Sequence, residues 1–391
     1  MADHLLAALQ QELKQREDHG LLRKRRLVQS AQGPHPQVDG QRVLSFCSND
    51  YLGLASHPAL QEALKAGVDV AGVGSGASHL VTGHHSFHHR LEEALAQFVG
   101  LPAALLFSTG YMANLAAICG LMGRNDALFA DKLNHASLND GAMLSRANLQ
   151  RYPHNDLASL ERLLAASTAA RKMVITDAVF SMDGDIAPLQ GLLDLCERHD
   201  AWLLIDDAHG FGVLGPQGRG CLSHFVLQSS RIIYMATLGK AAGVSGAFIA
   251  AEKIVIDYLI QNARTYIFTT AMPPAIAAAS LQSLKLIETC EDGRAHLREL
   301  ITLLRTRLQS SRWQLMDSAT PIQPLLIGSN NHAVTVSEEL LKQGILVPAI
   351  RPPTVPQGSA RLRFSLSAAH TTQDVERLSE ALRLTQDRLA A

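Results

Sequence analysis

Lys240 has the sequence surroundings that most favour covalent chemistry. It lies within residues 237–243, between two apolar runs and beside Gly239, whereas most other lysines have polar or charged neighbours. A lysine in poor solvent binds its proton less tightly, and the neutral amine can form a Schiff base. The glycines at 239 and 243 allow a sharp turn and the close approach of a ligand. The alternative is a structural lysine whose stem is buried and whose ammonium reaches water.

An acidic pair, Asp206 and Asp207, follows the apolar run Leu203-Leu204-Ile205. A carboxylate at the end of a buried strand is costly unless a cation pairs with it. The protonated ring nitrogen of pyridoxal 5'-phosphate is such a cation, and the pairing keeps the ring an electron sink. Asp206 alone could also be a metal ligand or a helix cap. Because Asp206 is followed along the chain by the glycine-flanked Lys240, we favour a pyridoxal phosphate site over these two alternatives.

Two weaker features fit the same cofactor. Residues 107–114 are typical of a strand, a turn and a helix that begins near Gly110. The free N–H groups and the positive dipole end of such a helix can hold a phosphate. His135 also stands near a predicted strand end, where it is either a capped loop residue or a ring stacked on a planar cofactor.

An α/β scaffold is needed to position these residues. Short apolar runs alternate with helical patterns from about residue 44, which indicates a layered fold with a largely parallel sheet. Ligands of such sheets bind beyond the carboxyl ends of the strands. We predict an N-terminal helical segment over 1–45, a large domain over 46–290 and a small α+β domain over 291–391. The predicted strands of the large domain are 103–107, 127–130, 173–176, 202–205, 232–236 and 247–250.

Composition excludes several classes of protein. The 391 residues have a net charge of −1, so the chain as a whole attracts neither nucleic acid nor an anionic membrane. The basic run at 23–26 is therefore interpreted as solvated. Residues 94–123 carry no charge, but their glycines and proline favour a helix end, a strand and a second helix over a membrane span. Scattered single cysteines and a charged N-terminus without an apolar core predict a cytoplasmic protein.

The histidines at 84, 85, 88 and 89 raise the possibility of a metal site. The pairs 84/88 and 85/89 have the i, i+4 spacing of one helix face. Without a His-Glu-x-x-His motif or an evident acidic ligand, we interpret the cluster as a solvated helix start and predict no metal.

As a set, five motifs resemble those of the α-oxoamine synthases. The resemblance runs from about residue 20 to the C-terminus in the expected order. It implies a fold-type I pyridoxal phosphate-dependent transferase, with a mostly parallel seven-stranded sheet in the large domain. Four positions depart from the family pattern: His79, where relatives often have arginine, Asp177, where glutamate is usual, and Leu238 and Phe211, where other residues are often found. The motifs lie at 48–53, 134–137, 180–185, 206–210 and 237–240.

The resemblance also implies roles for individual residues. It assigns catalysis to Lys240, His135, Asp206 and His209. It implies that Thr269 and Thr270 reach the cofactor of a second subunit, so that a homodimer shares its active sites. The implied cofactor-binding residues are Gly110, Tyr111, His135, Ser181, Asp206, His209, Thr237, Lys240, Thr269 and Thr270. The implied substrate-binding residues are Arg23, Asn49, His135, Arg351 and Thr354.

Residues 349–356 resemble the corresponding segment in one branch of this family. That resemblance implies decarboxylative condensation of L-alanine with a pimeloyl thioester, carried by coenzyme A or by an acyl carrier protein. The alternatives within the family are a 2-amino-3-oxobutyrate coenzyme A ligase and a 5-aminolevulinate synthase. A regulatory protein with a catalytically dead pyridoxal fold is the alternative from another class, but Lys240, Asp206, His135 and His209 are all present.

Overall fold

The chain folds into two compact units, each built from segments that are distant in sequence. The computed structural model describes residues 2–390. Unit 2 contains residues 52–181 and 186–294, and unit 1 contains the residues up to 51, residues 182–185 and those from 295 onward. The N-terminal segment thus groups with the C-terminal residues, because β3 (Leu44–Ser45) pairs with β13 (Ile345–Leu346). The large-domain segment 182–185 also joins unit 1, since Gly184 O accepts hydrogen bonds from the hydroxyls of Ser318 and Thr320.

Unit 2 is built on a seven-stranded sheet. The strand order is β4-β10-β9-β8-β7-β5-β6. The strands from β9 to β6 are parallel, whereas β10 runs antiparallel to both of its neighbours. The expected mostly parallel seven-stranded sheet is therefore confirmed. Its strands are β4 (Ala103–Phe107), β5 (Ala127–Asp131), β6 (Asn148–Tyr152), β7 (Lys172–Asp177), β8 (Trp202–Asp206), β9 (Ile232–Thr237) and β10 (Ala247–Ala251).

Burial on both faces explains why most of these strands are continuous apolar runs. On one face, alternate strand residues pack with α4, α5 and α9 in a single hydrophobic core. The helix α3 contacts β4 and β10, and the helix α7 contacts β7 and β8. The helical elements of unit 2 are α2 (Pro58–Ala71), η1 (His79–Gly83), α3 (Ser86–Val99), α4 (Gly110–Leu121), α5 (Ala136–Ser145), α6 (Leu157–Ala166), α7 (Leu189–Arg198), η2 (Pro216–Gly218), α8 (Cys221–Phe225), α9 (Lys253–Asn262), α10 (Arg264–Ile267) and α11 (Pro274–Thr289).

The strand β6 was absent from the sequence prediction. Its sequence, Asn-Leu-Gln-Arg-Tyr, lacks the apolar run of the other strands because β6 pairs on one side only, with β5. An edge strand is partly solvated, so the hydrophobic pattern that reveals a central strand is weak there.

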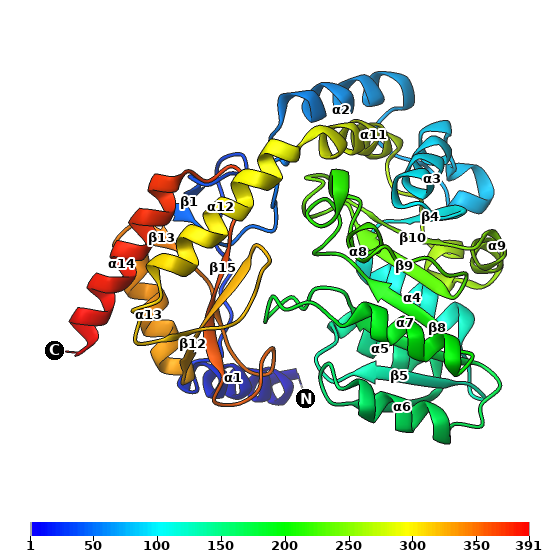
Figure 1. Cartoon of the computed structure of the whole chain (residues 1–391). Helices are drawn as coiled ribbons and strands as arrows, with labels where there is room; N and C mark the ends of the chain where they lie inside the picture. The colour runs from blue at the N-terminus through cyan, green and yellow to red at the C-terminus, as the bar shows by residue number, and fades with distance from the viewer. Residues whose placement is uncertain (1, 391) are drawn as a thin grey trace. The chain divides into compact units, whose positions relative to one another are not determined.

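Unit 1 contains a four-stranded sheet of order β11-β12-β15-β14. The helix α13 contacts β12 and β15, and α14 contacts α13 (Figure 1). The apolar run 345–350 suggests one strand, but it forms two, because β13 and β14 are separate and pair in different sheets. The remaining elements are α1 (Ala2–Asp18), β1 (Gln37–Val38), β2 (Gln41–Arg42), α12 (Glu291–Arg307), β11 (Gln314–Leu315), β12 (Ile322–Gly328), α13 (Asn330–Lys342), β14 (Ala349–Ile350), β15 (Ala360–Ser365) and α14 (Thr372–Ala390).

The uncharged stretch 94–123 forms the end of α3, the strand β4 and the helix α4. Among the described residues, none of the helices combines the length and the apolar character that a membrane span requires.

Candidate active site

Most of the residues predicted to act on the cofactor line one cavity in unit 2. Its volume is about 190 Å³. Asp177, Asp206 and Thr237 come from the carboxyl ends of three adjacent parallel strands, β7, β8 and β9. This is the edge where an open α/β sheet binds its ligands. The cavity is lined by Gly110, Tyr111, His135, Ser137, Asp177, Asp206, Ala208, His209, Met235, Thr237 and Lys240.

The amine of Lys240 lies at this cavity beside a histidine. Its Nζ is 2.8 Å from Nε2 of the buried His209. The turn that carries the lysine closes through a hydrogen bond from Gly243 N to Lys240 O at 2.8 Å. Gly243 has a φ of 68°, a conformation that favours glycine. The turn therefore presents the lysine side chain at a defined place beside His209.

The carboxylate of Asp206 is buried and held by two donors. Asn114 Nδ2 donates to Oδ2 at 2.7 Å, and the backbone N–H of Ala208 donates to Oδ1 at 3.0 Å. Asn114 also donates to the Ser137 hydroxyl at 2.9 Å. The sequence prediction missed Asn114. The usable signal was an asparagine within a largely apolar helical stretch, and in the structure this amide is buried in α4.

A second buried carboxylate, Asp177, positions His135. The two aspartates pair in register across β7 and β8, and Asp177 Oδ2 accepts the His135 N–H at 2.7 Å. Burial raises the pKa of Asp177 well above its usual value, and the neighbouring charge of Asp206 raises that pKa further. Burial lowers the pKa of His135, which favours the neutral imidazole. Asp177 thus positions His135 at the cavity, a role that the sequence analysis did not predict.

The strand, turn and helix predicted for the 107–114 segment are present, as the end of β4, the turn at residues 108–109 and the start of α4. Thr109 caps α4 by accepting the Met112 N–H at 3.2 Å, and the hydroxyl of Tyr111 hydrogen-bonds Asp140. The hydroxyl of Thr237 donates to Gly246 O at 2.9 Å. A polar helix end and a threonine hydroxyl therefore border the cavity near Gly110.

Three predicted cofactor residues do not line the cavity of their own chain. Ser181 begins the turn after β7. Thr269 and Thr270 follow α10, and Thr270 forms an isolated bridge with Ser78. Their roles stay predictions.

The predicted substrate residues other than His135 belong to unit 1. Asn49 Oδ1 accepts from Arg363 Nη2 at 3.2 Å, and Arg363 is buried, so this amide already has a cationic partner. Arg351 contacts Gly20 O and lines a groove of about 630 Å³ that Lys24 and Arg26 also line. Arg23 and Thr354 are exposed on loops. The sequence prediction missed Arg363.

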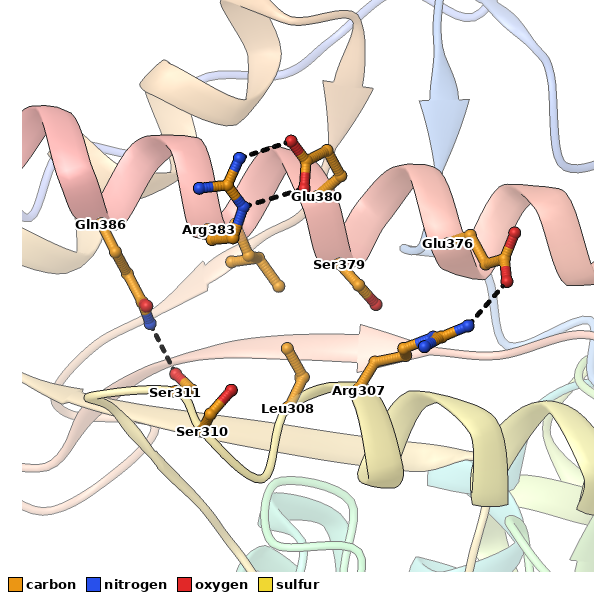
Figure 2. A pocket seen from close by; sticks show the side chains of 10 residues that line it. Arg307, Leu308, Ser310, Ser311, Glu376, Ser379, Glu380, Arg383 and Gln386 are labelled. Atoms are coloured by element: carbon orange, nitrogen blue, oxygen red, sulfur yellow. Dashed lines mark hydrogen bonds and ion pairs between the residues drawn. The ribbon is translucent and has the colours of Figure 1, made fainter.

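A second hollow in unit 1 lies beside α14 and has a volume of about 450 Å³ (Figure 2). Its charges are paired internally: Arg307 bonds Glu376 at 2.9 Å, and Arg383 bonds Glu380 at 2.7 Å. The pairs are half-exposed, as solvated surface ion pairs usually are. The cavity around Lys240 is the better candidate because its polar groups are buried and converge.

The chain belongs to the aminotransferase class I and II family, whose model matches residues 41–382. An 8-amino-7-oxononanoate synthase from Methylobacillus flagellatus is 62% identical, with 97% of this chain and 96% of that protein covered. Another from Nitrosospira multiformis is 61% identical, with 96% and 95% covered. The sequence resemblance is therefore confirmed.

Solved structures agree with this assignment. A high-resolution structure of SPT with its PLP internal aldimine has a TM-score of 0.92 at 28% identity and covers 98% of both chains. An 8-amino-7-oxononanoate synthase from Francisella tularensis has a TM-score of 0.78 at 34% identity, with 89% of this chain and 99% of that chain covered. The expected fold-type I class is confirmed.

The cavity residues fit pyridoxal phosphate in three respects. Lys240 offers an amine for the aldehyde, and the N-terminus of α4 at Gly110 offers N–H groups for a phosphate. The buried Asp206 carboxylate offers a partner for a protonated ring nitrogen. A cation beside Asp206 would also offset the repulsion between the two buried aspartates.

Gly243→Ala is expected to destabilise the turn that carries Lys240. A β-carbon there would meet Leu54 C and Ala55 N at 2.6 Å, in addition to the positive φ. The loss should be about 2–4 kcal/mol in the free energy of unfolding, measured by urea denaturation. Gly239→Ala is the matched control, because its β-carbon would meet its nearest neighbour at an ordinary 3.5 Å. Equal losses in the two variants would contradict this account of the turn.

Asp207→Asn is expected to change how stability depends on pH. Tyr234 Oη and Cys221 N each donate to Asp207 Oδ2 at 2.7 Å, and burial raises the pKa of Asp207 to about 7. The native chain therefore holds a proton there between about pH 4 and 7 that the unfolded chain has lost. The contribution of Asp207 to the free energy of unfolding is therefore greatest below about pH 4 and decreases as the pH rises to 7.

Asparagine does not titrate and keeps an acceptor for both donors. The unfolding free energy of Asp207→Asn, relative to the parent, should therefore rise by about 2 kcal/mol between pH 5 and pH 8. Parallel urea titrations at the two pH values measure this difference. A difference that does not change with pH would show that Asp207 is ionised throughout the range.

Proposed function

We propose that the chain is a pyridoxal phosphate-dependent 8-amino-7-oxononanoate synthase of biotin biosynthesis. In this reaction Cα of L-alanine joins the acyl carbon of a pimeloyl thioester, and carbon dioxide and the free thiol leave. The observation that carries the proposal is the cavity that holds Lys240, His209, Asp206 and His135, in a chain 62% identical to a curated enzyme of that name.

The bound cofactor supplies an electron sink for the electron pair left at Cα of the amino acid. Lys240 is the amine that we assign to cofactor attachment and to moving the Cα proton, because Nζ is the nucleophilic nitrogen at the cavity. His209 holds that nitrogen in place at 2.8 Å. Asp206 would carry the negative charge that keeps the ring nitrogen protonated, with Asn114 fixing its orientation.

His135 contributes a neutral ring whose orientation is fixed from two sides. Its backbone N–H bonds Asp177, and its Nδ1 lies 2.7 Å from the Ser137 hydroxyl. We assign this ring to stacking on the cofactor and to contact with the substrate.

The guanidinium of Arg351 is our candidate for a substrate carboxylate, since its planar fork can make two parallel hydrogen bonds. Arg23, Asn49 and Thr354 are proposed as further substrate contacts. Asn49 would act together with Arg363, which donates to its Oδ1. A cytoplasmic location stays a prediction.

Incubating the purified holoenzyme with L-alanine and pimeloyl-coenzyme A should give 8-amino-7-oxononanoate, identified by mass spectrometry. A parallel reaction with pimeloyl-acyl carrier protein identifies the preferred carrier. Lys240→Ala should lose the yellow colour of the attached cofactor and essentially all turnover, and borohydride should fix the cofactor to Lys240 in the parent.

Amino-acid choice is the sharpest test, because one methyl group is worth only about 1–3 kcal/mol in a pocket. Some turnover of glycine is compatible with the proposal. Glycine with succinyl-coenzyme A clearly exceeding alanine with pimeloyl-coenzyme A would contradict it in favour of 5-aminolevulinate synthesis. If turnover of glycine with acetyl-coenzyme A exceeds turnover of alanine with pimeloyl-coenzyme A, the chain is instead a 2-amino-3-oxobutyrate coenzyme A ligase.

We also propose an isologous homodimer in which Thr269 and Thr270 complete the partner's phosphate site. Two observations support this. These threonines do not line the cavity of their own chain, and Thr270 pairs with Ser78 beside the exposed apolar side chains Leu80, Val81 and Phe268. Apolar side chains gathered at such a place are typical of a surface that a second copy covers.

Co-expression tests the shared site. A Lys240→Ala chain and a Thr269→Ala/Thr270→Ala chain should each be nearly inactive, but hybrid dimers have one intact site. Random pairing should restore about a quarter of the parental activity. The control places all three substitutions on one chain and co-expresses it with Lys240→Ala, which should restore nothing. Hybrid activity no greater than this control would contradict the shared site.

A further inference from the structure

The segment from His79 to Glu92 gathers imidazole and carboxylate groups outside the cavity of Lys240. His79 begins η1, His84 and His85 precede α3, and His88, His89 and Glu92 lie on α3. One ligand atom each of His84, His89 and Glu92 lies within 4.8 Å of the other two. From the sequence, the histidine pairs 84/88 and 85/89 share a helix face, and no acidic ligand was evident. In the structure, one histidine of each pair, His84 and His89, lies near Glu92.

His88 is not available as a ligand, although its ring also lies near His79 and His84. Its Nε2 is 2.8 Å from Met272 O, which requires a proton on that nitrogen. Its Nδ1 accepts the His85 N–H at 3.1 Å, which occupies the remaining lone pair. Both ring nitrogens of this fully buried histidine therefore have structural partners.

His84 is oriented by its contact with His79. The two Nδ1 atoms are 2.9 Å apart, so one of them carries the shared proton. We place this proton on His84 Nδ1, so that His79 Nδ1 is the acceptor. With the proton on His84 Nδ1, the lone pair of His84 Nε2 is free to bind, 3.8 Å from Glu92 Oε2. Metal-binding histidines usually donate their second ring N–H to an acceptor in this way.

Glu92 supplies a mostly buried carboxyl group at the same place. Its side chain is 13% exposed, and Oε1 accepts the Leu106 N–H at 3.0 Å. A cation bound at Oε2 would compensate a charge that the surrounding protein solvates poorly.

We propose that His84, His89 and Glu92 bind one divalent cation of the zinc type, with water completing its coordination. Two imidazoles and one carboxylate form a ligand set that zinc and similar borderline cations accept, whereas calcium and magnesium prefer oxygen alone. Ligand atoms about 2 Å from one ion are roughly 3.3 Å apart. Closure therefore needs shifts of about 1 Å, and the 65%-exposed His89 side chain would exchange its 3.4 Å contact with Glu93 Oε1 for the ion.

Such an ion would tie the turn after η1 to the first turns of α3. None of its three ligands lines the cavity around Lys240. The proposed ion is consequently structural, and its binding does not depend on the proposed synthase reaction. His79 is a positioning residue that acts through His84.

Calorimetric titration of chelator-treated holoenzyme with zinc chloride tests the site. We expect one high-affinity Zn²⁺ per chain. His84→Asn, His89→Asn and Glu92→Gln should each weaken binding by at least tenfold, and His79→Phe by about tenfold or more through loss of the acceptor. Glu92→Gln keeps an acceptor for Leu106, and His89 is exposed, so these variants should fold.

His85→Asn is the matched control, because His85 caps α3 and asparagine is also a good cap. It should bind zinc within about threefold of the parent. Absence of zinc binding by the parent would overturn the proposal. So would binding that persists unchanged in the combined His84→Asn/His89→Asn/Glu92→Gln variant, since the ion would then lie elsewhere.

Discussion

The burial of negative charge at the ends of β7 and β8 is the constraint on which the candidate active site depends. Asp177 and Asp206 pair in register, and both are buried. Each has a defined set of donors: the His135 N–H for Asp177, and Asn114 with the Ala208 N–H for Asp206. Two such carboxylates side by side are unfavourable without a cation. A protonated pyridine nitrogen satisfies this need, so the acidic residues at this edge of the sheet favour such a cofactor.

Around this pair, rigid backbone places the reactive groups. The parallel strands bring Asp177, Asp206 and Thr237 to one edge of the sheet, and the turn closed by Gly243 brings Lys240 to the same cavity. Asp207, the next residue after Asp206, bonds Tyr234 and Cys221 instead and holds the loop after β8. Adjacent aspartates thus have separate tasks because successive residues at a strand end point to opposite sides.

The histidine-rich segment shows the same physics in another part of unit 2. Glu92 is a buried carboxylate whose Oε2 faces an imidazole nitrogen, and His88 is a buried imidazole with both nitrogens engaged. One histidine of the run is therefore part of the core, whereas Nε2 of His84 lies 3.8 Å from Glu92 and Nε2 of His89 lies 3.4 Å from Glu93. Residue type and spacing do not distinguish these cases; the partner of each ring nitrogen does.

The sequence by itself determined the scaffold and the chemistry-bearing residues. The apolar runs predicted six of the seven strands, and Lys240, Asp206, His135 and His209 were identified from local context and from motif order. Local sequence carries this information because burial, turns and strand ends leave periodic or compositional marks. The polar edge strand β6 left no such mark. Only the tertiary structure revealed that Asn114 orients Asp206, that Asp177 holds His135, and that Arg363 engages Asn49. Those contacts join residues between 42 and 314 positions apart. They are decided by which side chains the packed elements bring within hydrogen-bonding distance, and no local pattern encodes that choice.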